Sequence, residues 1–136
     1  MKSRCLAITA ALLLAATGLT QRGDLRPVAN VTQLMQAMVI PASNALFDLP
    51  RKPPESEQEW SEARNSAVIL AESGNLLLIG RRAMRSDVWV STSQALTEAG
   101  KAALEATLEK DVESITEIGN QIIEACETCH EKHWIR

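Results

Sequence analysis

The sequence predicts an all-α protein, an antiparallel up-down-up-down four-helix bundle that follows an N-terminal signal peptide. Only 3% of the 136 residues are aromatic, and there is no Tyr. The apolar residues are mainly Ala and Leu, which favour helices over strands. Apolar residues also recur every three or four positions in four stretches that are separated by short connections. Amphipathic helices joined by short loops pack best as antiparallel neighbours.

Residues 1–20 have the layout of a secretory signal peptide. Lys2 and Arg4 give a positive start, and residues 6–19 are apolar or small. The alternative is an uncleaved membrane anchor. The run is short for that, because a membrane span needs about 20 apolar residues. We expect export to the periplasm, no stable membrane insertion of the mature chain, and a single domain over residues 21–136.

The first two helical stretches have clear boundary signals. The first follows Pro27, and Pro41 predicts a bend within it because proline lacks a backbone donor. Its apolar stripe is Val31, Leu34, Met35, Met38, Ala42, Ala45 and Leu49. The second opens with Ser56 and Glu59 at the capping-box spacing and stops near Gly80. Its expected buried face is Trp60, Ala63, Ala67, Leu70 and Leu77.

Two aspartates mark the starts of the remaining helices. Asp87 is expected to cap the third helix and Asp111 the fourth. The expected buried face of the third helix is Val88, Thr92, Ala95, Ala99, Ala103 and Ala106. That of the fourth is Ile115, Ile118, Ile122, Cys126, Cys129 and His133.

The most informative motif lies in the fourth stretch, where Cys126, Cys129 and His130 form C-x-x-C-H. This is the attachment pattern of c-type haem. At 3.6 residues per turn, all three side chains project from one side of a helix. Two thiols can then bond the two vinyl groups of one porphyrin while the imidazole binds its iron. The motif predicts one haem c with His130 as the proximal iron ligand.

Other interpretations of the motif carry less weight. Two Cys and one or two His on a single helix cannot complete a tetrahedral zinc site alone. Two exposed thiols would be a liability in an oxidising compartment. A redox-active C-x-x-C pair is the main alternative, but such pairs usually open a helix beside a sheet. No acid-base pair, activated nucleophile or phosphate-binding loop is recognisable, so we do not expect an enzyme.

On these features the chain resembles the class II c-type cytochromes, the cytochrome c′ family, over essentially the whole mature region. The resemblance is carried by residues 126–134 in the last helix and residues 34–41 in the first. It implies a four-helix-bundle cytochrome domain with one haem, a His proximal ligand and frequent homodimers. The family includes Met-ligated electron carriers and five-coordinate members with an apolar distal pocket.

The expected antiparallel packing brings the start of the first helix and the loop after the second to the end of the last helix. The residues expected near the haem are Val31, Thr32, Leu34, Met35, Met38, Arg81, Arg82, Met84 and Arg85. Met35 is the predicted distal iron ligand, since a thioether paired with His suits electron transfer. A packing role for Met35 is the alternative, and a shift of one turn places Thr32 over the iron.

The arginines of the 81–85 loop either pair with the haem propionates or are solvated. His133 lies three residues after His130 on the same helix and is expected to pack rather than bind iron. Two functions follow: a one-electron carrier that meets redox partner proteins, or a five-coordinate haem protein that binds NO or CO. A net charge of −3 without a basic cluster argues against nucleic acid.

Overall fold

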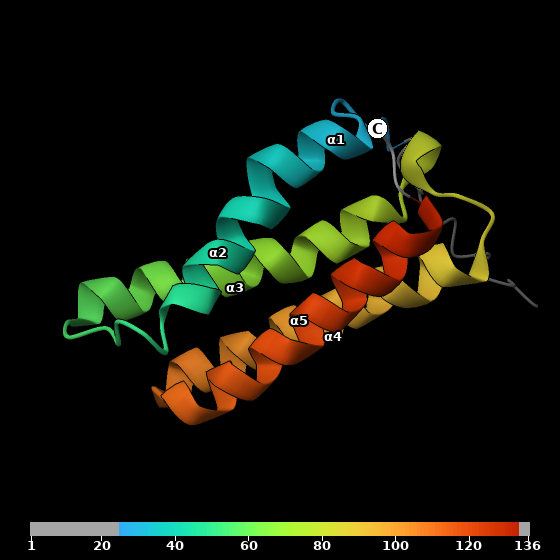
Figure 1. The fold of residues 1–136 in the computed structure, drawn as a ribbon. Coiled ribbons are helices and arrows are strands. Elements are labelled where there is room, and N and C mark those ends of the chain that lie inside the picture. Colours follow the sequence, from blue (N-terminus) through green and yellow to red (C-terminus); the bar gives the residue numbers. More distant parts are fainter. Residues whose placement is uncertain (1–24, 134–136) are drawn as a thin grey trace, which may run out of the picture.

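A computed structural model describes residues 25–133 of the chain. The signal peptide expected over residues 1–20 lies outside this part. The described residues are helical and bundle-like, without strands, so the all-α prediction is confirmed for them (Figure 1). The elements are α1 (Val31–Leu34), a π-helical turn (Met35–Val39), α2 (Ile40–Asp48), α3 (Glu57–Leu77), a 3₁₀ turn (Gly80–Arg82), α4 (Asp87–Glu109) and α5 (Val112–His133).

The helix starts follow local hydrogen-bond chemistry. Ser56 and Glu59 form the predicted capping box of α3. Asp111 accepts the backbone N–H of Ser114 at 3.0 Å, which caps the first turn of α5 as predicted. The cap of α4 is Ser86 rather than Asp87, which is the first residue of that helix. The prediction for α4 was therefore wrong by one residue.

The first predicted helix also starts later than expected. Asn30, not Pro27, precedes its first turn, and its side chain accepts the N–H of Gln33 at 2.8 Å. α1, the π-helical turn and α2 then follow one another without a break, and we call these residues, 31–48, the N-terminal segment. Its helical backbone widens just before Pro41 and continues through it.

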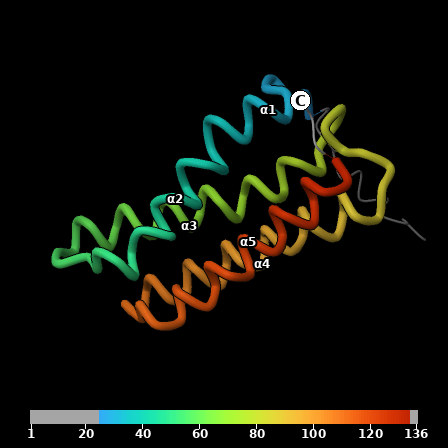
Figure 2. The backbone as a smooth tube through the Cα atoms, in the orientation of Figure 1, coloured from blue at the N-terminus to red at the C-terminus, as the bar shows by residue number. Residues whose placement is uncertain are grey.

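Helices α3, α4 and α5 form a closely packed unit, and Figure 2 shows them side by side. Two glycines of this three-helix unit permit the contact between α3 and α4. A Cβ atom at Gly100 would lie 2.4 Å from the backbone N of Ala71, and one at Gly74 would lie 2.6 Å from the carbonyl of Ser93. Distances below about 3 Å between such atoms are not tolerated, so the two backbones are in direct contact.

The predicted buried faces are confirmed in α3 and partly in α4 and α5. Every residue expected to be buried in α3 is buried. In α4 the expected face omitted Trp89, Ser93 and Leu96, which are buried, while Val88 is half-buried and Ala95 is exposed. In α5 the predicted isoleucines and Cys129 are buried.

None of the helices in residues 25–133 is long and apolar enough to cross a membrane.

The N-terminal segment packs unevenly on the three-helix unit. α2 contacts α3 and α5, and the π-helical turn contacts α3, whereas α1 has few contacts with any of them. In Figure 1 the blue end of the segment diverges from the red end of α5. A cavity lies at this end of α5, and it is lined by residues of both the N-terminal segment and α5.

Candidate functional site

The C-x-x-C-H motif occupies the C-terminal turns of α5, on one wall of a cavity of about 260 Å³. Cys129 is buried, Cys126 is half-buried and His130 is exposed at the opening. The helical spacing brings all three to the same cavity, as the motif requires for chemistry on a single group.

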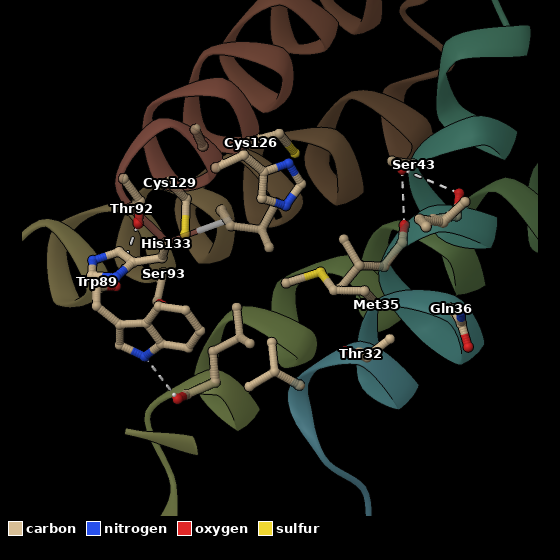
Figure 3. Close-up of a pocket in the computed structure, with 17 residues that line it drawn as sticks. Thr32, Met35, Gln36, Ser43, Trp89, Thr92, Ser93, Cys126, Cys129 and His133 are labelled. Carbon is tan, nitrogen blue, oxygen red and sulfur yellow. Dashed lines mark hydrogen bonds between the residues drawn. The ribbon is translucent and has the colours of Figure 1, made fainter. Parts of the chain in front are cut away.

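The opposite wall comes from α1 and the π-helical turn. Its lining residues include Val31, Thr32, Met35 and Gln36. Figure 3 shows the Met35 side chain extending into the cavity, across from the helix that carries Cys126. A soft thioether therefore faces the wall that carries the thiols and the imidazole.

The structure separates the methionines that the sequence left as candidates. Met35 lines the cavity, whereas Met38 and Met84 are partly buried against the core and are not among its lining residues. Leu34, also expected near the site, is buried in the core instead. Among residues 25–133, Met35 is thus the methionine that lines the cavity together with the motif.

The predicted arginine cluster does not line this cavity. Arg81 and Arg85 are exposed, as expected of a solvated loop. Arg82 is buried, and its Nε has no hydrogen-bond partner within the described part of the chain. A pairing of these arginines with haem propionates stays a prediction.

The rear wall is a surface of α4 formed by Trp89, Thr92, Ser93 and Leu96, of which the sequence pattern indicated only Thr92 as buried. Trp89 is 1% exposed, and its indole N–H donates to the carbonyl of Leu77 at 3.1 Å. The ring of His133 meets Trp89 edge-on, with centroids 5.5 Å apart, and His133 Nε2 is hydrogen-bonded to Ser86 Oγ at 3.0 Å. These contacts fix the end of α5 against the start of α4. His133 packs, as predicted.

One hydroxyl in the cavity wall differs from the others. Ser43, Ser73 and Thr92 are buried, and each donates to the carbonyl four residues earlier in its helix, at 2.6 to 2.8 Å. Ser93 Oγ is buried without any such partner, and Ser93 lines the cavity. A buried hydroxyl that lacks a partner is costly.

The two thiols of the motif are free and form no disulfide. Burial raises the pKa of the Cys126 thiol, and the neighbouring Cys129 and Glu127 raise it further. A disulfide oxidoreductase needs the opposite, a cysteine pKa lowered by a helix N-terminus or a nearby cation. This motif lies at the C-terminal end of α5, where the helix dipole does not favour a thiolate.

Comparison with known proteins adds no relative: no protein-family model, no curated protein and no solved structure matches the chain.

Within residues 25–133 no group of three or more His, Cys, Asp and Glu side chains converges on a point. The cavity instead combines two thiols, the imidazoles of His130 and His133 and one thioether with a largely apolar wall. This donor set fits a haem, which needs thiols for its vinyl groups and axial ligands for its iron.

Proposed function

We propose that the chain is a mono-haem c-type cytochrome of the class II type that carries single electrons in the periplasm. Cys126 and Cys129 hold haem c through thioether bonds, His130 is the proximal iron ligand and Met35 is the distal one. The proposal is supported above all by one observation: the C-x-x-C-H wall faces an apolar cavity, and a methionine enters that cavity from the other side.

The bound haem iron supplies a one-electron couple, and the chain supplies its surroundings. His130 and Met35 would hold the iron, and the thioether would favour a high reduction potential because it stabilises the reduced iron. Trp89, Leu77 and Leu96 keep water from the inner wall, since they are buried or line the cavity with apolar surface. These residues need not move when an electron is gained or lost.

The finer fold belongs to this proposal. It is an antiparallel up-down-up-down four-helix bundle over residues 21–136, preceded by a cleaved signal peptide over residues 1–20. Support comes from the short connections between the helices and from the cavity, which joins the end of α5 to α1. Redox proteins are the expected partners, and a homodimer is the expected assembly for this family.

A second candidate function is a five-coordinate haem protein that binds NO or CO. The observation that favours it is the position of Thr32, which lines the same cavity three residues before Met35. If the iron lay below Thr32 instead of Met35, no side chain with a soft donor would face it. Met35 would then fill space on the distal side.

Spectroscopy with two matched variants separates the two functions. The chain is expressed with its signal peptide in a host that matures c-type cytochromes, and visible spectra are recorded oxidised, reduced and after addition of CO. We expect a low-spin, six-coordinate spectrum that Met35→Ala converts to a high-spin, CO-reactive one. Met38→Ala is the control, because Met38 is half-buried in the same segment but does not line the cavity.

Three other results would each have a clear meaning. A wild-type spectrum that is already high-spin and unchanged by Met35→Ala would favour the gas-binding function. A colourless protein with the mass of the bare polypeptide would contradict both haem functions. If that colourless protein also formed a reversible disulfide between Cys126 and Cys129, it would support a thiol oxidoreductase instead.

A further inference from the structure

We propose that Pro41 is a positioning residue that imposes the π-helical turn and thereby aims Met35 into the cavity. The turn spans Met35–Val39 and is followed by Ile40 and then Pro41, which lies in the first turn of α2. The assignment of Met35 as an iron ligand rests on the proposed function. The control of helix register by Pro41 does not.

The hydrogen bonds of the turn give the first argument. The backbone N–H of Ile40 donates to the carbonyl of Met35, five residues earlier, instead of to Gln36. Pro41 has no N–H, and in a regular helix its ring would clash with the carbonyl four residues earlier, that of Ala37. Ala37 lies inside the π-helical turn. The wider turn relieves this clash, and such turns are frequent at functional sites.

The spacing of the buried residues gives the second argument. Leu34 and Val39 are both 3% exposed and lie five positions apart. A regular α-helix would bury residues three or four apart on one face. The π-helical turn contains one additional residue. Leu34, before the turn, and Val39, at its end, can therefore both face the core.

The register has a direct consequence for the cavity. If residues 31–40 formed a regular α-helix in phase with α2, each position before the turn would rotate by roughly 100°. Gln36 would then take the place of Met35, and Met35 would take the place of Leu34 in the core. The site would lose its thioether and gain a polar amide.

The first test is Pro41→Ala in the haem-loaded full chain. We expect the turn to relax toward a regular helix, with loss of the Met-ligated low-spin spectrum, a lower reduction potential and unchanged covalent haem content. Pro53→Ala is the control, because Pro53 is exposed in the loop before α3. A Pro41→Ala protein with the wild-type spectrum and potential would overturn the proposal.

The second test is a rescue that a merely structural role of Pro41 would not produce. Ala37 is exposed within the turn, and its deletion removes the additional residue. Combined with Pro41→Ala, this deletion lets a regular helix enter α2 while α1 keeps its original phase. We expect Met ligation to return in the double variant. Deletion of Ala37 alone leaves Pro41 to clash inside a regular helix, and we expect it to destabilise the protein.

A haem-free readout distinguishes failure of this proposal from failure of the proposed function. With methyl-labelled methionine, nuclear Overhauser contacts from the Met35 methyl group to other cavity residues are measured in the apoprotein. We expect these contacts in the wild type, their loss in Pro41→Ala and their return in the double variant. Their persistence in Pro41→Ala would overturn the proposal whether or not the wild type binds haem.

Discussion

The three-helix unit and the N-terminal segment are packed in opposite ways. In the three-helix unit, Gly74 and Gly100 remove side chains so that two backbones touch. In the N-terminal segment, α2 contacts α5, but the π-helical turn and α1 have few contacts with it. The cavity lies between these two regions. The candidate site thus lies where the loosely packed N-terminal segment meets the closely packed three-helix unit.

The two regions also differ in how regular their helices are. α3 and α4 are uninterrupted helices of 21 and 23 residues, and the motif on α5 is held against α4 through Trp89 and His133. The distal wall belongs to a segment divided into runs of four, five and nine residues. In the proposed function, the covalent attachment is therefore built on the region of long, regular helices, while the proposed distal ligand Met35 belongs to the interrupted segment.

The largest expected effect comes from removing both attachment thiols. Cys126→Ser with Cys129→Ser leaves no sulfur for thioether bonds, so all covalent haem is lost. The measurement is the mass of the protein under denaturing conditions, together with its visible spectrum. Thr128→Ala is the control, because Thr128 lies between the two cysteines but is exposed.

The thiol variants also test the comparison between the two regions. If the three-helix unit is stable by itself, amide hydrogen exchange in α3 and α4 should slow little on haem attachment. Exchange in α1 and the π-helical turn should slow strongly, since their contacts with the rest of the chain are few. Equal protection of both regions in the haem-free variant would contradict this difference.

The next effect concerns the close approach of α3 and α4. Gly100→Ala places a methyl group 2.4 Å from the backbone N of Ala71, and backbone atoms cannot yield as a flexible side chain can. We expect a loss of about 2–3 kcal/mol in the free energy of unfolding, measured with urea. Gly119→Ala is the matched control. Its new methyl would meet only the Phe47 ring at 3.6 Å, and helix propensity predicts a gain of up to about 1 kcal/mol.

The contrast between the two regions also explains what sequence could predict. The capping box of α3 and the motif on α5 depend on residues three or four apart, so local spacing was sufficient. The burial of Trp89 and Leu96 was missed because α4 packs against both α3 and α5. A helix between two neighbours buries a wider face than the single stripe that was expected.

In the N-terminal segment, the predicted buried stripe was partly wrong for a different reason. The expected stripe assumed constant helical phase, and its members Leu34, Ala42 and Leu49 are buried. It also included Met38 and Ala45, which are half-buried, and it omitted Val39 and Leu46, which are buried. The π-helical turn shifts the phase by one residue, and no regular period can follow it. Pro41, with apolar residues five positions apart before it, was the signal for this turn.

A smaller effect is expected at the unpaired hydroxyl of the cavity wall. Ser93→Ala removes a buried group that has no partner in the described structure, so the apoprotein should gain on the order of 1 kcal/mol. Thr92→Val is the control, because it removes a hydroxyl that donates to the Val88 carbonyl at 2.7 Å. That change should cost about 1 kcal/mol. Urea unfolding of both apoproteins checks the opposite signs.

The smallest effect is a pH dependence at the end of the molecule far from the cavity. Hydrogen bonds from the backbone N–H of Glu55, then from the hydroxyl and N–H of Ser56, lower the pKa of Glu59 below its usual value of 4.5. A carboxyl whose pKa is lowered on folding stabilises the protein above its unfolded pKa, and this stability is lost as the pH falls through the folded value.

Glu59→Gln should therefore be slightly less stable than the wild type at neutral pH, and the difference should shrink as the pH falls below about 4.5. Because Glu59 lies at the surface and is only partly buried, salt and water keep the effect small. Unfolding by urea at a series of pH values measures it, and Glu62→Gln, an exposed neighbour in the same helix, is the control. The visible spectrum should stay constant throughout this series, since the capping box belongs to the three-helix unit and touches no residue of the cavity. A spectrum that changed together with Glu59 protonation would mean that the two regions are coupled after all.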